Sequence, residues 1–157
     1  MTRPDALQPA RAVPNARVET LEPCPPSRYR ALYAGVGESW HWHDRNAWTD
    51  ARLAAHLADP GVSVHLFVVD DEPAGYFELQ RHDDGDVELV YFGLFPERIG
   101  KGFGGAMLTA ATVEAWRQGA TSVWLHTCTL DHPHALANYR ARGFEEFKQE
   151  TYETMLS

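Results

Sequence analysis

Glycines crowd a short stretch of the chain between an apolar, β-branched and aromatic run and a helical pattern. Residues 95–105 have the sequence FPERIGKGFGG, with glycine at positions 100, 102, 104 and 105. Glycine allows a backbone to turn tightly and to approach an anion closely, and the N–H groups of a new helix would face that anion. The spacing therefore predicts a turn that binds a phosphorylated ligand.

The same glycines satisfy the dinucleotide pattern G-x-G-x-x-G, which does not name the ligand by itself. A dinucleotide fold usually opens with this turn after its first strand and carries an acidic residue about twenty positions further on. Here most of the chain precedes the glycines, and residues 119–122 are Gly-Ala-Thr-Ser. A P-loop is disfavoured because the chain has no Gly-Lys-Ser or Gly-Lys-Thr. A nicotinamide dinucleotide stays as an alternative ligand on the literal match alone.

Length and composition limit the classes of protein that the chain can form. The 157 residues, 44% of them apolar, suit one domain. A net charge of −8 repels polyphosphate, so no nucleic-acid partner is expected. The chain shows no apolar run of about 18 residues and no signal-peptide core, which predicts a cytoplasmic protein without a membrane partner. Cys24 and Cys128 lack metal-ligand spacing, so we expect free thiols and no metal site.

Hydrophobic periodicity predicts one α/β (α+β) domain over residues 17–157, preceded by a flexible N-terminal tail over residues 1–16. Strands are predicted over 17–21, 64–69, 74–80, 87–95, 122–127 and 144–155. Helices are predicted over 27–34, ended by Gly35 and Gly37, from Thr49 or Asp50 to Asp59, from the glycines to Gly119, and over 133–142. The order β-α-α-β-β-β-α-β-α-β implies a central mixed, mostly antiparallel sheet flanked by helices.

This order of elements, with the glycine turn after the fourth strand, resembles the GNAT (N-acetyltransferase) superfamily. The resemblance covers residues 17–155 in element order and is specific in residues 88–108 and 127–144. Members carry Arg or Gln, two variable residues, Gly, one variable residue and Gly or Ala in a loop that follows a strand ending in a bulge. Here IGKGFG fills that frame, with Ile99 in place of the polar residue. The resemblance implies coenzyme A contacts from Leu94, Ile99, Gly100, Lys101, Gly102, Phe103, Gly104 and Gly105, beside a bulge near Leu94.

Glu88 stands in the strand that leads to this loop. Strict alternation puts its side chain on one face with those of Val90 and Phe92. The resemblance to histone-type members implies that Glu88 is the general base, which takes a proton from an ammonium substrate directly or through water. The alternative is a solvated charge on an exposed strand face.

Residues 135–144, ALANYRARGF, match the second signature of the family, an alanine four residues before a tyrosine and then Gly-Phe. The match implies that Tyr139 is the general acid, since a phenol within hydrogen-bond reach can return a proton to a departing thiolate. The alternative is a core tyrosine on the same helix stripe as Leu136. Where members often have Asn before this helix, the chain has Asp-His-Pro-His, and His132 is expected to contact the coenzyme arm or to be a loop residue.

Aromatic and imidazole side chains are unusually frequent over residues 40–48. In the family this region helps to form the acceptor pocket, which implies substrate contacts from Trp40, Trp42 and His43. Such side chains could hold a cation or a ring. The alternative is that the tryptophans belong to the core.

The resemblance implies an acetyl-CoA-dependent N-acetyltransferase that transfers an acetyl group to a primary amine, in a small molecule or a peptide, and releases coenzyme A. Transfer would be direct, within a ternary complex. A homodimer is compatible with the resemblance. The alternative is a non-catalytic acyl-CoA-binding or sensing module, which Ile99 and the missing Asn motivate.

Overall fold

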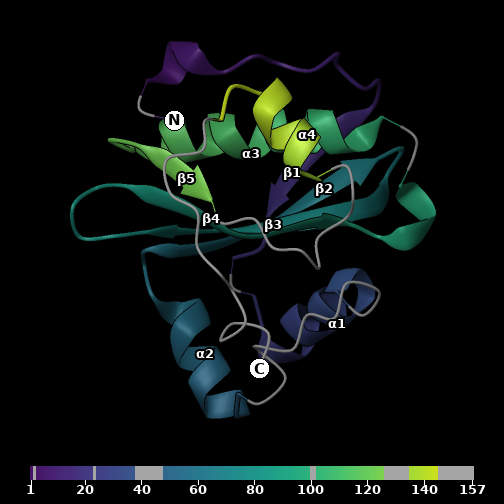
Figure 1. Ribbon diagram of the computed structural model, residues 1–157. Coiled ribbons are helices and arrows are strands. Elements are labelled where there is room, and N and C mark those ends of the chain that lie inside the picture. The colour runs from purple at the N-terminus through teal and green to yellow at the C-terminus, as the bar shows by residue number, and fades with distance from the viewer. Residues whose placement is uncertain (2, 23, 38–47, 100–101, 126–134, 145–157) are drawn as a thin grey trace.

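A five-stranded sheet separates two layers of helices in the computed structural model (Figure 1). The structure describes residues 1, 3–22, 24–37, 48–99, 102–125 and 135–144. The strands are β1 (Ala16–Thr20), β2 (Val62–Val69), β3 (Glu72–Arg81), β4 (Val87–Leu94) and β5 (Val123–Leu125), in that order across the sheet. Neighbours from β1 to β4 are antiparallel, whereas β4 and β5 are parallel. The sheet is therefore mixed and mostly antiparallel, as predicted.

The helices cover both faces of this sheet. Helices α1 (Pro26–Gly37) and α2 (Asp50–Ala58) lie on one face, and α3 (Phe103–Arg117) and α4 (Ala135–Ala141) lie on the other (Figure 1). Two short 3-10 helices, η1 (Pro4–Ala6) and η3 (Pro96–Arg98), complete the elements. No helix in the described ranges is both long and apolar enough to span a bilayer. The strand predicted over 144–155 falls on residues that lie, apart from Phe144, outside the described part of the chain.

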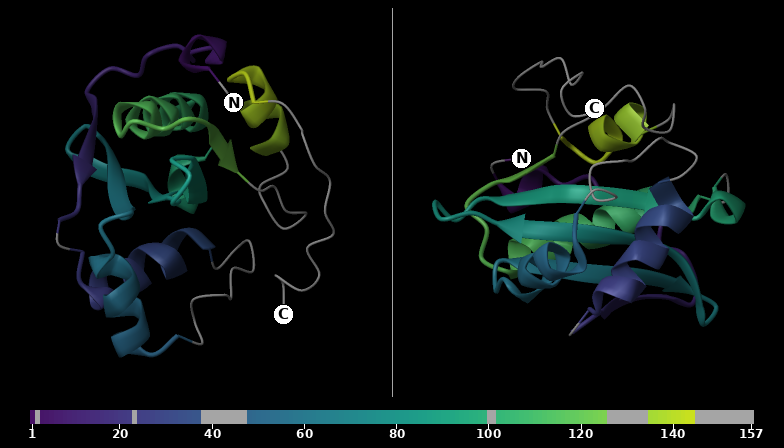
Figure 2. Two further views of the ribbon diagram at one scale, coloured as in Figure 1. Left: turned by 90° about the vertical axis from the view of Figure 1, so that its left-hand side faces the viewer. Right: turned by 90° about the horizontal axis from the view of Figure 1, so that it is seen from below.

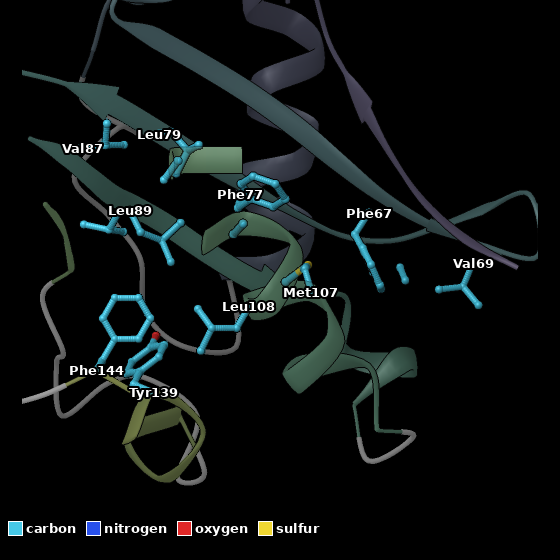
Figure 3. Close-up of a cluster of buried hydrophobic side chains, with 14 residues drawn as sticks. Phe67, Val69, Phe77, Leu79, Val87, Leu89, Met107, Leu108, Tyr139 and Phe144 are labelled. Atoms are coloured by element: carbon cyan, nitrogen blue, oxygen red, sulfur yellow. The ribbon is translucent and has the colours of Figure 1, made fainter. Parts of the chain in front are cut away.

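Each face of the sheet carries its own apolar core because helices cover both faces. The α3-side core is centred on side chains from β2, β3, β4, α3 and α4, among them Phe67, Phe77, Leu79, Leu89, Met107, Leu108, Tyr139 and Phe144 (Figure 3). The α1–α2 core contains the opposite faces of the same strands and includes Tyr29, Leu32, Tyr33, Leu53, Val64, Leu66 and Tyr76. Strands β2 and β3 are consequently buried on both faces over most of their length.

One helix end differs from the prediction. The sequence predicted that Gly35 and Gly37 end the first helix, but α1 continues through Gly35 to Gly37. A Cβ on Gly35 would lie 2.8 Å from a ring carbon of Phe95, so this glycine allows the helix to pack closely against the end of β4. The start of α2 is as predicted, because the Thr49 hydroxyl accepts a hydrogen bond from the backbone N–H of Arg52.

The N-terminal segment, residues 1–16, lies across α3 and α4 (Figure 2). The backbone N–H of Gln8 donates to the carbonyl of Arg142 at 2.8 Å. At the segment's start, the backbone N–H of Val123 in β5 donates to the carbonyl of Met1 at 2.8 Å. These contacts come from backbone groups, which hydrophobic periodicity does not reveal, and the flexibility predicted for the segment stays a prediction.

One extra residue interrupts the pairing of β4 with β3. Leu79 pairs with Leu89, but the preceding residue of β3, Glu78, pairs with Tyr91, so Val90 has no counterpart. This is a β-bulge, which inserts one residue into one strand of an antiparallel pair. It lies earlier in the strand than the position near Leu94 that the resemblance implied.

The bulge reverses the alternation of side chains along β4. Leu89 lies in the α3-side core, so its neighbour Glu88 points to the α1–α2 face. Beyond the bulge, Phe92 packs against the α3-side core and Tyr91 against the α1–α2 core. The prediction that Glu88 and Phe92 share a face is therefore wrong, because a shift of one residue moves every later side chain to the other face.

His65 is a buried histidine on the α3 side of β2. Its Nδ1 lies 3.0 Å from the Thr20 hydroxyl, and its Nε2 lies 2.8 Å from the Ser63 hydroxyl. A hydroxyl can donate or accept, so the neutral ring is satisfied at both nitrogens. The pKa of His65 is lowered to about 4, mainly by burial. The charge of Glu114 raises this pKa and that of Arg117 lowers it, each by less than burial does.

We expect this histidine to make the protein less stable as the pH falls below neutrality. In the unfolded chain its pKa returns to about 6.5, so between pH 6.5 and 4 the unfolded state binds a proton that the folded state does not. Between pH 7 and pH 5 this linkage removes about 2 kcal/mol from the free energy of unfolding. Urea unfolding of the wild type and of His65→Gln at both pH values should show a flatter pH dependence for the variant. Equal pH dependences would contradict the assignment.

Candidate active site

The glycine turn between β4 and α3 leaves the N-terminus of α3 open at one point. Gly102 is the N-cap of α3 and has a left-handed backbone, with φ of 80° and ψ of 9°. A Cβ at Gly102 would meet no atom within 4 Å among the residues that the structure describes. The first turn of α3 carries no acidic side chain, and a glycine N-cap offers no side-chain acceptor to its N–H groups. The turn therefore presents backbone donors and the positive end of a helix dipole, an arrangement that favours an anion.

The other two described glycines of the turn serve packing. A Cβ on Gly104 would lie 3.6 Å from the side-chain amide of Asn138 in α4. A Cβ on Gly105 would lie 2.9 Å from the Cβ of Ala10 and 3.1 Å from the guanidinium of Arg142. These glycines bring α4 and the N-terminal segment close to the first turn of α3.

The end of the strand before the turn, and the segment just after it, contact β3. Leu94 pairs with Gly75 of β3, and a Cβ on Gly75 would lie 2.4 Å from the carbonyl oxygen of Gly93. After the strand, Arg98 donates to the Glu72 carboxylate at 2.6 Å, and the backbone N–H of Ile99 donates to Pro96. The Arg98 guanidinium, which precedes the turn, is thus already paired with Glu72.

Glu88 contacts a histidine and a tryptophan on the α1–α2 face of the sheet. Its Oε1 lies 3.1 Å from Nε2 of His82, in the turn before β4. The His82 ring stacks on Trp124, with centroids 5.8 Å apart and planes at 23°. Trp124 is the residue of β5 that pairs with Glu88. The side chain of Glu88 is 17% exposed, which lies between the two environments, catalytic pocket and solvated face, that the sequence left open.

Tyr139 lies on the opposite face of the sheet from Glu88. The residue is 6% exposed and is part of the α3-side core with Leu108 and Phe144 (Figure 3). Its ring meets that of Phe92 edge-on, with centroids 6.3 Å apart. The core position that the sequence offered as an alternative is therefore observed. The residue nevertheless lies beside β4, close to the strand segment beyond the bulge.

Several predicted site residues lie outside the described part of the chain. These are Gly100 and Lys101 in the turn, His132 before α4, and the residues Trp40, Trp42 and His43 of the aromatic region. Cys128 also lies there. Their predicted contacts stay predictions.

The described cysteine is poorly suited to act as a nucleophile. Cys24 is a free, buried thiol, and burial raises its pKa. Because the thiolate is the reactive form, a raised pKa disfavours nucleophilic chemistry at this position.

Comparison with known proteins identifies the family of this architecture. Residues 21–144 match the model of the acetyltransferase (GNAT) family. The chain belongs to the GNAT family. The matched region includes β4, the glycine turn, α3 and α4, and so contains both Glu88 and Tyr139.

Two curated GNAT-type relatives match half of the chain. They are uncharacterized N-acetyltransferases of Mycobacterium bovis (strain ATCC BAA-935 / AF2122/97) and Mycobacterium tuberculosis (strain ATCC 25618 / H37Rv), each 36% identical over 77 residues. The match covers 49% of this chain and 49% of each relative. The chain thus spans about half the length of the curated relatives it matches.

Solved structures share the GNAT fold at low sequence identity. An aminoglycoside acetyltransferase from an uncultured soil metagenomic sample, solved with trehalose, has a TM-score of 0.69 at 13% identity and covers 87% of this chain and 93% of its own. A putative acetyltransferase of Bacillus subtilis has a TM-score of 0.64 at 18% identity, with 86% and 96% covered. The ribosomal-protein-alanine N-acetyltransferase of Brucella melitensis biovar Abortus 2308 has a TM-score of 0.63 at 12% identity, with 86% and 95% covered. These likenesses show the fold.

Sequence reasoning missed a second carboxyl cluster beneath the α1–α2 layer. Glu78 of β3 is fully buried, and its Oε1 accepts a hydrogen bond from the Tyr29 hydroxyl at 2.5 Å. Its Oε2 lies 2.8 Å from Nε2 of His56 in α2. The signal available was a lone acidic residue within the apolar run of β3, since a fully buried carboxyl group requires partners. The cluster joins α1 and α2 to the sheet.

Tyr29→Phe should destabilise the fold by about 1–3 kcal/mol, because it removes the donor to a buried carboxyl oxygen and keeps the ring. Urea unfolding measures the difference in free energy. Tyr29→Leu also loses the ring contacts with Tyr33 and Tyr76 and should cost more. A Tyr29→Phe variant as stable as the wild type would show that the hydrogen bond contributes nothing.

Proposed function

We propose that the protein is an acetyl-CoA-dependent N-acetyltransferase that transfers an acetyl group directly to a primary amine within a ternary complex. The observation that carries the proposal is the arrangement along β4 in a GNAT chain. Glu88 stands before the bulge, and the strand then leads to the helix N-terminus at Gly102. This arrangement supports a proton acceptor and a phosphate site on one strand.

The turn fits the phosphates of coenzyme A. Gly102 and Phe103 begin a helix of 15 residues whose first turn is free of acidic side chains, so its N–H groups and dipole favour a pyrophosphate. The other proposed coenzyme contacts come from the end of β4, the turn and the segment before α4: Leu94, Ile99, Gly100, Lys101, Gly104, Gly105 and His132. When bound, acetyl-CoA supplies the acetyl group as a thioester.

The two proposed proton-transfer groups lie on opposite faces of the sheet. Glu88 points to the α1–α2 face, and Tyr139 is packed on the α3 side. We infer that the acceptor amine approaches from the α1–α2 side and that the thioester lies beside β4, between the two groups.

Each group moves one proton in the proposed reaction. Glu88 accepts a proton from the ammonium group of the acceptor, so that the nitrogen lone pair can attack the thioester carbonyl. The carbon–nitrogen bond forms as the carbon–sulfur bond breaks, and the Tyr139 hydroxyl gives a proton to the leaving sulfur. The nitrogen then loses its second proton, which restores the hydroxyl of Tyr139, and the proton on Glu88 passes to water. Binding both substrates together makes a covalent enzyme intermediate unnecessary.

The acceptor belongs to the class of cationic amines in this proposal. A net charge of −8 attracts a cation, and the named structural neighbours include an aminoglycoside acetyltransferase and a ribosomal-protein-alanine N-acetyltransferase. Small-molecule amines and peptide N-termini are therefore both tested as acceptors. Trp40, Trp42 and His43 are the proposed acceptor contacts.

A non-catalytic acyl-CoA-binding or sensing module is the second candidate. It is favoured by Ile99 at the position where a polar side chain is usual, and by the burial of Tyr139 within the α3-side core. This candidate binds the coenzyme and lacks turnover, so binding and catalysis are measured separately.

Calorimetric titration should show micromolar binding of acetyl-CoA and no binding of NAD or NADP. Gly102→Ala should weaken acetyl-CoA binding about tenfold or more. Alanine disfavours the left-handed φ of Gly102, so the backbone of the turn shifts and misplaces an N–H donor, and a lost charge-assisted hydrogen bond costs about 1.5–3 kcal/mol. Gly119→Ala is the matched control, since Gly119 also has a left-handed φ and open space at its Cβ but lies at the other end of α3. Both variants should lose similar stability. Equal acetyl-CoA affinities would contradict the proposed phosphate site.

Catalysis should depend on Glu88 and Tyr139. With spermidine, sisomicin and an alanine-initiated peptide as acceptors, Glu88→Gln and Tyr139→Phe should each lower kcat by about 10²- to 10⁴-fold, measured as thiol release. Acetyl-CoA affinity by calorimetry should stay within a few-fold of the wild type. Coenzyme binding without turnover of any acceptor would favour the sensing module, and unchanged kcat in both variants would refute the assigned roles.

A further inference from the structure

We propose that His82 is a positioning residue that fixes the carboxylate of Glu88 through a hydrogen bond from its Nε2. The inference rests on the proposed function, in which Glu88 takes the proton of the acceptor amine. It adds a residue from the turn between β3 and β4, outside the two signature segments of the GNAT resemblance.

The contact joins a turn to the strand that leads to the coenzyme site. Nε2 of His82 lies 3.1 Å from Oε1 of Glu88, six positions further along the chain. An ionised carboxylate can only accept hydrogen bonds, so Nε2 carries the proton in the state that is ready to react. A hydrogen bond of this kind holds one carboxylate oxygen and so fixes the plane of the group.

His82 is itself held in place by three further contacts. Its ring stacks on Trp124, which belongs to β5 and pairs with Glu88. Its backbone N–H donates to the carbonyl of Asp86 at 2.9 Å, and its carbonyl accepts from Gly85 at 2.9 Å. Gly85 permits this tight turn because its φ is 89°. Stacking on Trp124 and the two backbone hydrogen bonds of the turn therefore orient the imidazole.

Orientation of the Glu88 carboxylate matters because the side-chain alternation of β4 is interrupted at Val90, two residues further on. The bulge at Val90 makes the path of the strand irregular just beyond the proposed base. A glutamate has three side-chain torsions, and proton transfer requires a defined oxygen position. His82, which stacks on Trp124, restricts those torsions through its hydrogen bond to the carboxylate.

The first test needs no substrate. In nitrogen-15 NMR spectra of the histidine rings, the His82 signals are assigned by their loss in His82→Gln. Wild-type Nε2 should show a protonated, hydrogen-bonded ring nitrogen, and Glu88→Gln should shift the His82 signals while those of His56 and His65 stay unchanged. His82 signals that are identical in the wild type and Glu88→Gln would overturn the proposed contact.

The second test separates positioning from a merely structural role. With saturating acetyl-CoA and an amine that the wild type acetylates, His82→Leu should lower kcat about tenfold to a hundredfold, as expected when a reacting group is misplaced by about 1 Å. His82→Gln keeps an N–H donor and should recover kcat to within a few-fold. His56→Gln, which alters the histidine bound to Glu78, is the matched control and should lower stability without lowering kcat of the folded protein.

The outcomes distinguish this inference from the proposed function. If Glu88→Gln keeps wild-type kcat, the proposed base is wrong whatever His82 does. If Glu88→Gln is inactive and His82→Leu keeps wild-type kcat, only the role of His82 is overturned. A His82→Gln variant as slow as His82→Leu would show that a hydrogen-bond donor is insufficient, which also overturns positioning. If no tested amine is acetylated, the NMR comparison alone decides whether the contact exists.

Discussion

The bulge at Val90 is the constraint on which the arrangement of the site depends. Without it, Glu88 and Phe92 would share a face of β4, and the strand could not serve both layers of helices as it does. With it, the strand directs Glu88 toward α1 and α2 and then returns Phe92 and Leu94 to the α3-side core. With this single inserted residue, β4 places a carboxylate on one side of the sheet and an apolar contact for Tyr139, the ring of Phe92, on the other.

The packing around α3 meets a second requirement, which is to leave a helix N-terminus exposed while burying the rest of the helix. Met107, Leu108, Ala111 and Ala115 bury one side of α3 against the sheet. The small residues of the first turn allow α4 and the N-terminal segment to come close. As a result, α4 and the N-terminal segment pack against the first turn of α3.

Element order, the glycine turn and the two signature segments could be predicted because each is a local property of the chain. Periodicity gave no sign of the bulge, because both Tyr91 and Phe92 are apolar. A shift of one residue exchanges the faces of these two side chains and leaves the pattern equally apolar. Gly35 was predicted to end a helix, and only its distance to Phe95 shows why it continues. The contacts of Glu78 with Tyr29 and His56 join residues 49 and 22 positions apart, which spacing alone does not bring together.

The crowding around Gly105 limits how a ligand can reach α3. Ala10 and Arg142 stand against one flank of the first helical turn, and Asn138 stands beside Gly104. A Cβ on Gly102, in contrast, would meet no atom of the described residues within 4 Å. A ligand larger than a small anion would therefore meet α4 and the N-terminal segment on the crowded flank of the helix.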